Sequence, residues 1–213
     1  TILAPGVGAQ GGAISNKSSS NILYSISRSI INSKNPIAKS KQYYDLIHSK
    51  SLYNKLIDKN YIKNGKFILS SGLESNYYVD LKELTGDILL FKEVIKLLSV
   101  HIMNESLLGV ESGSISLATG IALSNNLNFG YIRKKQKTYA QKKYIEGAVS
   151  KDYPITIIDD VLTTGKSLQA AITIARLEGY NINQAVVIAQ RGVEGKHLLE
   201  KMGVRTTALI KLP

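Results

Sequence analysis

One stretch of the chain, residues 155–167, constrains its fold more than any other. It begins with Ile-Thr-Ile-Ile, a short β-branched run that is typical of a strand buried on both faces of a parallel sheet. Two carboxylates, Asp159 and Asp160, follow directly, and an apolar pattern with helical spacing starts at Leu168. Because alternating strands and helices build parallel sheets, the stretch predicts an α/β fold.

The segment between the two acids and the predicted helix contains the residues that we expect to bind an anion. They are Val161, Leu162, Thr163, Thr164, Gly165, Lys166 and Ser167. A turn of this kind offers backbone N–H groups and hydroxyls to a phosphate, with the helix dipole behind them. Gly-Lys-Ser also ends a P-loop, but a P-loop requires glycine where this chain has Asp160. Acids suit a diol and the turn suits a phosphate, so the stretch predicts a site for a ribose 5-phosphate.

An apolar strand, Asp-Asp and Thr-Thr-Gly-x-Ser in this order resemble the phosphoribosyl-diphosphate motif of type I phosphoribosyltransferases. The resemblance implies their fold, a central parallel sheet with helices on both faces and a small hood, over residues 49–213. Residues 65–80 resemble the amino-terminal signature of orotate phosphoribosyltransferases. This chain departs from that signature at Ser70, where the family has Lys, and at Asn76, where it has Pro.

Membership of that family would give each part of the site a role. The reaction joins orotate to phosphoribosyl diphosphate and yields orotidine 5′-phosphate and diphosphate. The resemblance implies that Asp159 and Asp160 hold the ribose hydroxyls, and that residues 161–167 bind the substrate, with the 5′-phosphate on the turn. It also implies that Arg191, together with Thr163, orients orotate, and that Mg²⁺ is carried by the substrate rather than by protein ligands.

A basic segment, residues 133–143, has six basic residues and no acid. Long cationic side chains on a loop can cover a diphosphate leaving group and exclude water. The segment resembles the basic loop of the same family at Arg133, Lys134, Lys137 and Tyr139, and departs from it at Thr138 and Ala140. The resemblance gives Lys137 a catalytic role and implies that the loop reaches a neighbouring subunit. We therefore expect a homodimer with shared active sites.

Residues 1–48 resemble a different family, the carboxyl-terminal end of orotidine 5′-phosphate decarboxylases. A glycine-rich loop between two predicted strands, the second at residues 22–27, is how a TIM barrel holds a phosphate after its last strands. The resemblance assigns a remnant phosphate site to Gln10, Gly11, Gly12 and Arg28. The decarboxylase's catalytic residues lie on strands that the segment lacks, so we expect no decarboxylation. The order predicts a fused decarboxylase–phosphoribosyltransferase of the UMP synthase type, with Thr1 as an internal start.

Gly6-x-Gly8-x-x-Gly11 also fits a dinucleotide fingerprint, but no acid precedes Asp45, so we reject it.

Composition excludes several classes of protein. The 213 residues contain no cysteine, which excludes disulfides and cysteine zinc sites. The net charge is +11, but no nucleic-acid module is visible, and a small polyanionic substrate explains the basic loop better. No apolar run is long enough to span a membrane. We expect a soluble, cytoplasmic enzyme without nucleic-acid or membrane partners.

Two alternatives remain open at the level of sequence. One is a phosphoribosyltransferase for another base, such as a purine, which Arg191 argues against because a purine has no carboxylate. The other is a regulator that binds phosphoribosyl diphosphate without catalysis, which the basic loop argues against.

Overall fold

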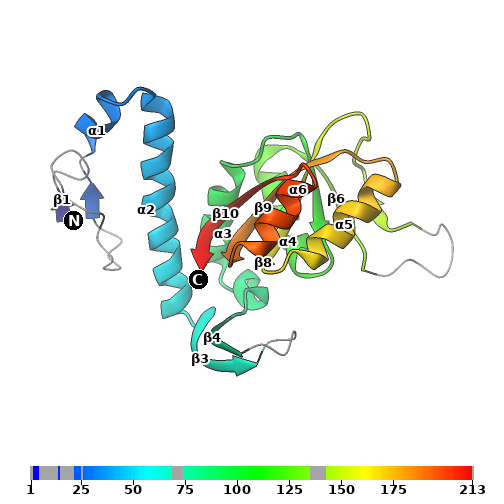
Figure 1. Cartoon of the computed structure of the whole chain (residues 1–213), viewed down its shortest axis with the longest axis horizontal. Helices are drawn as coiled ribbons and strands as arrows, with labels where there is room; N and C mark the ends of the chain where they lie inside the picture. The colour runs from blue at the N-terminus through cyan, green and yellow to red at the C-terminus, as the bar shows by residue number, and fades with distance from the viewer. Residues whose placement is uncertain are drawn as a thin grey trace. The chain divides into compact units, whose positions relative to one another are not determined.

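The computed structural model describes residues 2–4, 14, 22–24, 26–68, 74–134 and 143–212. The chain divides into two compact units, Thr1–Tyr77 and Tyr78–Pro213. Figure 1 labels most of their helices and strands along the chain.

The larger unit is built on one sheet. Its strands are Ser106–Val110 (β5), Asn128–Ile132 (β6), Ile145–Gly147 (β7), Ile155–Leu162 (β8), Ile182–Arg191 (β9) and Arg205–Leu212 (β10). They lie in the order β10-β9-β8-β5-β6-β7, and all neighbouring pairs among them are parallel except β6 with β7. The predicted central parallel sheet is confirmed. β7 was not predictable, because its three residues are too few to show a period.

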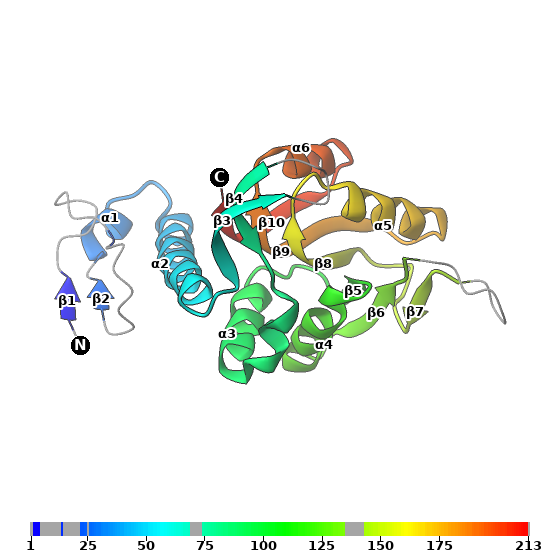
Figure 2. The same ribbon diagram turned by 90° about the horizontal axis from the view of Figure 1, so that it is seen from below.

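Helices cover both faces of this sheet. They are Ile88–Ser99 (α3), Gly113–Asn125 (α4), Lys166–Leu177 (α5) and Glu194–Lys201 (α6), and a short 3₁₀ helix, Lys82–Gly86 (η1), precedes α3. Figure 2 shows the sheet between α3 and α4 on one side and α5 and α6 on the other. The helices leave the central strand without a solvent-facing side, and Ile155, Ile157 and Ile158 are fully buried. Its run of apolar residues, unbroken by the usual alternation, follows from that burial.

A buried polar network closes the amino-terminal edge of the sheet. The Gln184 side chain, only 3% exposed, accepts hydrogen bonds from the backbone N–H of Met103 (3.1 Å) and the Thr156 hydroxyl (2.7 Å). It also donates to the His101 carbonyl at 2.8 Å. Asn104 donates to Thr156 as well, at 3.0 Å. The network ties the segment after α3 to β8 and β9.

The described residues of the smaller unit form two short sheets and two helices. Strands Ile2–Ala4 (β1) and Ile22–Tyr24 (β2) pair in parallel. Helices Ser27–Ile31 (α1) and Pro36–Asp58 (α2) follow. Strands Ile62–Ile68 (β3) and Glu74–Val79 (β4) pair in the region predicted as the hood, and β4 runs two residues past the unit's end.

Two predictions for this part of the chain were wrong. The apolar residues of the sequence predict one helix from near Pro36 through Ile47 and another from about Leu52 to near Asn60, whereas the structure has a single helix, α2. No glycine or proline interrupts the segment between them. The second predicted strand stops at Tyr24, and Arg28 lies inside α1 rather than at a strand end. Serine favours the start of a helix, and α1 begins at Ser27.

The predicted domain boundary between residues 48 and 49 lies within α2, whereas the compact units divide after Tyr77. The two-stranded sheet of β3 and β4 is thus grouped mainly with α2. A division by ancestry need not follow a division by contacts, so the boundary at residue 49 stays a prediction.

Within the described residues, no helix is long and apolar enough to cross a membrane. The expected cytoplasmic location stays a prediction.

Candidate active site

The two acids lie near the carboxyl end of β8, which is longer than predicted. Val161 and Leu162 were expected in a loop, but they continue the strand and pair with Ala189 and Gln190 of β9. The reason is packing, because the Leu162 side chain is 1% exposed. The phosphate turn therefore begins at Thr163.

Backbone N–H groups hold both carboxylates. The N–H of Asp160 donates to Asp159 Oδ1 at 3.0 Å, and the N–H of Val161 donates to Asp160 Oδ1 at 2.7 Å. Burial raises the pKa of Asp159 to about 7, and the negative charge of Asp160 adds to the shift. The Asp160 N–H and the positive charge of Lys134 oppose it. A cation or a hydroxyl donor brought to this carboxylate would stabilise its charged form.

The predicted phosphate turn leads directly into a helix. Gly165 has φ +77°, a conformation that favours glycine, and it is the N-cap of α5. It brings no side-chain cap to the helix. Thr163, Thr164, Lys166 and Ser167 are exposed. The turn therefore presents hydroxyls and the amino end of a helix to solvent, as an anion site requires.

A second turn, residues 111–114, lies beside the acids. A Cβ added at Gly113 would be only 3.1 Å from Asp160 Oδ2, so the backbone of this turn approaches the carboxylate closely. Ser114 fastens the turn to the end of β5, because its hydroxyl lies 2.7 Å from both the N and the O of Val110. These contacts place the backbone of the turn next to Asp160.

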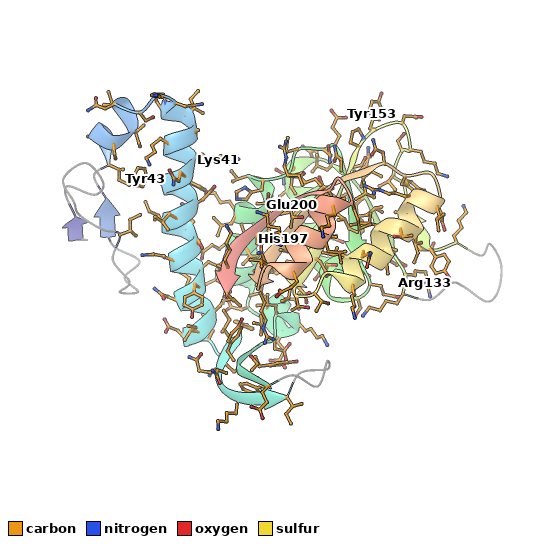
Figure 3. The ribbon with its side chains drawn as sticks, viewed as in Figure 1. Lys41, Tyr43, Arg133, Tyr153, His197 and Glu200 are labelled. Carbon is orange, nitrogen blue, oxygen red and sulfur yellow. The ribbon has the colours of Figure 1, made fainter. Side chains whose placement is uncertain are left out.

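The described part of the basic loop lies on the hairpin of β6 and β7. Arg133, labelled in Figure 3, donates its N–H to the Tyr144 carbonyl at 2.8 Å, and its guanidinium lies 4.0 Å from Glu146. Arg133 and Lys134 border a pocket of about 160 Å³ together with Ser167 of the phosphate turn. The other lining residues are Val110, Ile132, Ala170, Ala171 and Ile174. The root of the basic loop and the turn therefore share one cavity.

Arg191 is the last residue of β9 and is partly buried. Parallel strands end at the same edge, and Leu162 of β8 pairs with Gln190. Gln190, 4% exposed, donates to the Gly192 carbonyl at 2.8 Å and fixes the bend after the strand. The Arg191 side chain is therefore attached at the same edge of the sheet as Asp159 and Asp160.

Several predicted site residues lie outside the described part of the chain. They are Lys137, Tyr139, Gln10, Gly11 and Gly12. Of Arg28 the structure describes only the backbone. Their assigned roles stay predictions.

Sequence reasoning missed two carboxylates at the roots of the basic loop. Glu111 Oε2 accepts from the N–H of Lys134 at 2.8 Å, and Glu178 Oε1 accepts from the N–H of Tyr144 at 3.1 Å. The first contact joins residues 23 positions apart and the second joins residues 34 positions apart. No local pattern in the sequence could have indicated them.

The parallel sheet, the two acids at a strand end and the turn ahead of α5 define a type I phosphoribosyltransferase in fold. A search of protein-family models finds no match. Among known proteins, the orotate phosphoribosyltransferase of Methanococcus maripaludis is 34% identical over 171 residues, which are 76% of this chain and 92% of the relative. The chain belongs to the orotate phosphoribosyltransferase family.

Solved structures agree with this assignment. The crystal structure of the orotate phosphoribosyltransferase from Aeropyrum pernix matches with a TM-score of 0.68 and 30% identity, over 76% of this chain and 93% of that one. The structure of UMP synthase from Leishmania donovani matches with a TM-score of 0.68 and 27% identity, over 99% of this chain and 50% of that one.

Proposed function

We propose that this chain transfers the phosphoribosyl group of 5-phosphoribosyl 1-diphosphate to orotate, giving orotidine 5′-phosphate and diphosphate, a step of UMP biosynthesis. Family membership supports this activity. The observation that carries it is the pair Asp159 and Asp160 on a strand that runs, two residues later, into an exposed phosphate turn ahead of α5.

The residues of the site divide the work along the substrate. Backbone groups of residues 163–167 bind the 5′-phosphate at the start of α5. Asp159 and Asp160 accept hydrogen bonds from the ribose hydroxyls and stabilise positive charge on the ring as the bond from C1′ to the diphosphate breaks. A ring nitrogen of orotate forms the new bond to C1′. Arg191, with Thr163, pairs with the orotate carboxylate and orients the base.

The departing diphosphate takes the bonding electrons and needs compensating positive charge. Arg133 and Lys134 supply it from the described root of the basic loop, and we assign Lys137 and Tyr139 to the same task.

Partly buried carboxylates beside a polyanion suit Mg²⁺, which binds through one or two carboxylates together with substrate phosphates. No group of three acidic or histidine side chains that could hold a metal occurs within the described ranges. The Mg²⁺ ion would be carried by the substrate rather than by protein ligands, as the resemblance implies, and it would supply further charge neutralisation.

The experiment is a transfer assay with phosphoribosyl diphosphate and Mg²⁺, in which loss of orotate is followed at its ultraviolet band. Parallel reactions contain adenine, hypoxanthine or uracil. Transfer to orotate alone supports the proposal. Transfer to another base would make the chain a phosphoribosyltransferase of different specificity. Tight binding of phosphoribosyl diphosphate without any transfer would make it a regulator.

We further propose that residues 1–48 are the end of an orotidine 5′-phosphate decarboxylase barrel, in a fusion with the decarboxylase ahead of the transferase. Two observations support this origin. Strands β1 and β2 pair in parallel, as consecutive strands of a barrel do. The match to Leishmania donovani UMP synthase spans 99% of this chain and therefore includes most of this segment.

A further inference from the structure

Glu111 is hydrogen-bonded to the chain on both sides of Arg133. Its backbone N–H donates to the Ile132 carbonyl at 2.9 Å, and its side-chain Oε2 accepts from the N–H of Lys134 at 2.8 Å. A carboxylate that accepts from a backbone N–H makes a charge-assisted hydrogen bond, which is stronger than a neutral one. One residue thus fixes the direction in which the chain leaves β6 and enters the basic loop.

The same turn touches the acids. Gly113, two residues after Glu111, approaches Asp160 so closely that an added Cβ would lie 3.1 Å from Oδ2. On the other side, the charge of Lys134 reaches Asp159 and lowers its pKa. Through Glu111 and Gly113, the turn therefore connects the backbone of Lys134 with Asp159 and Asp160, on which the positive charge of Lys134 acts.

A negative side chain beside a diphosphate site is unfavourable for substrate binding unless it also makes a favourable contribution. Glu111 adds negative charge to a region where Arg133, Lys134 and the amino end of α5 attract anions. Its repulsion of a diphosphate would weaken substrate binding. The hydrogen bond to the N–H of Lys134 makes that favourable contribution.

We infer that Glu111 is a positioning residue for the transfer reaction: it anchors the backbone of Lys134 so that the ammonium group is directed at the diphosphate leaving group. This inference rests on the proposed function. Glu178 holds the opposite root of the loop through Tyr144, but it lies at the end of α5, remote in sequence from the turn beside Asp160. Loss of Glu178 should therefore loosen the loop without uncoupling Lys134 from the acids.

Three substitutions separate reach from charge. Glu111→Gln keeps the reach and an accepting oxygen but removes the charge. Glu111→Asp keeps the charge but is one methylene too short to accept from Lys134 in the same backbone geometry. Glu111→Ala removes both. Glu200→Ala, on α6 (Figure 3), removes an exposed carboxylate that pairs with Lys196, and serves as the matched control.

The measurements are kcat and KM for each substrate, and the dissociation constant of phosphoribosyl diphosphate by calorimetry. We expect Glu111→Ala and Glu111→Asp to raise the KM and the dissociation constant for phosphoribosyl diphosphate by roughly tenfold, which corresponds to about 1.4 kcal/mol. The KM for orotate should change less than twofold, and Glu200→Ala should resemble the wild type. Glu111→Gln, which keeps a weaker, neutral hydrogen bond, should lose clearly less affinity than Glu111→Asp. Circular dichroism and thermal unfolding check that each variant is folded. If Glu111→Ala does not fold, the comparison of Asp with Gln still decides.

Three outcomes would overturn the inference. One is an unchanged affinity for phosphoribosyl diphosphate in folded Glu111→Asp and Glu111→Ala. Another is a Glu111→Gln variant as defective as Glu111→Asp, because a side chain of the same reach that still accepts from the N–H of Lys134 would then give no advantage. The third is an equal loss for both substrates. Calorimetry needs no turnover, so it tests Glu111 even if the wild-type chain does not transfer to orotate, a result that would defeat the proposed function alone.

Discussion

At the scale of single residues, the pair of acids combines a chemical task with an electrostatic cost. The Asp160 N–H stabilises Asp159, yet burial and the neighbouring carboxylate still raise the pKa of Asp159 to about 7. A group perturbed in this way by burial and a charged neighbour is often a functional one.

Replacement of Asp160 by Asn should lower kcat by roughly 10²-fold, because one preorganised electrostatic group is lost from the site. The fold should hardly change, since Asp160 is only partly buried at the sheet edge. Steady-state kinetics with orotate and a thermal melt measure the two effects. Wild-type turnover in this variant would remove Asp160 from the site.

Asp159 should also make stability depend on pH. Its pKa rises from 3.8 to about 7 on folding, so the folded state binds the proton more tightly than the unfolded state. The stabilisation is complete below pH 3.8 and is lost as pH rises through about 7. Asp159→Asn should therefore unfold with a free energy higher than the wild type by on the order of 2–4 kcal/mol at pH 8.

The difference between the two proteins should shrink toward zero near pH 3. Denaturant unfolding at a series of pH values measures it, and Glu200→Ala serves as the control for an exposed acid. A constant difference across the series would contradict the shifted pKa.

The sequence predicted the residues of the site that follow one another along the chain. Asp159, Asp160 and the turn after them form one local motif, and Arg191 stands at the end of an apolar run. Glu111 and Glu178 were not predictable in this way, because their roles come from hydrogen bonds across the fold. A carboxylate near a basic loop carries no sequence mark that separates a positioning residue from a solvated surface acid.

At the scale of elements, the two edges of the sheet are specialised. The carboxyl edge carries exposed polar groups for chemistry, whereas the amino edge has a buried network around Gln184.

Gln184→Leu should destabilise the protein by roughly 2 kcal/mol, because the buried Thr156 hydroxyl and the partly buried Met103 N–H and His101 carbonyl each lose a partner. The KM values for both substrates should stay the same, since this edge is opposite to the site. Urea unfolding measures the loss. Asn183→Ala, which removes a contact on an exposed side chain, should cost well under half as much.

Elements were predictable where burial dictates composition. The strand β8 and the helix α5 were predictable because an apolar run marks the strand and an apolar stripe marks the helix. Their ends were less predictable, and β8 ran on to Leu162 because cross-strand pairing with β9 outweighs the local polarity of the two acids. The helix α2 was divided in error, because its spacing of apolar residues is irregular although nothing in it stops a helix.

At the scale of the whole molecule, residues 1–48 should be dispensable for orotate transfer. A shortened chain that begins at Ser49 should keep kcat within a few-fold, but it cuts α2 and leaves the buried Leu52 and Leu56 near the new end. A second shortened chain that begins at Asn35 keeps the whole helix and the Asn35 side chain that caps it.

Activity is measured for both shortened chains with orotate, and decarboxylation of orotidine 5′-phosphate is measured for the full 213 residues, where we expect none. Loss of transfer in both folded, shortened chains would show that the first 34 residues serve the reaction. Loss in the shorter one alone would point to the cut helix instead.

The active site should be completed across a dimer by Lys137, as the family resemblance implies. Lys137→Ala and Asp160→Asn homodimers should each be nearly inactive. Mixing and reassembling them should restore up to about a quarter of wild-type activity, since a two-fold dimer of one chain of each kind has one site with both native residues. Mass measurement confirms that heterodimers are present. Heterodimers without any recovered activity would exclude a shared site.

The position of β8 in the sheet has a consequence for amide hydrogen exchange. The strand has β5 on one side and β9 on the other, and both of its faces are covered, so the amides of residues 155–159 should exchange only when the whole unit unfolds. At Thr163 this protection ends, because the turn is exposed. Asp159 thus stands on a strand that is protected in this way, while the phosphate turn, a few residues away, can adjust to its ligand without disturbing it.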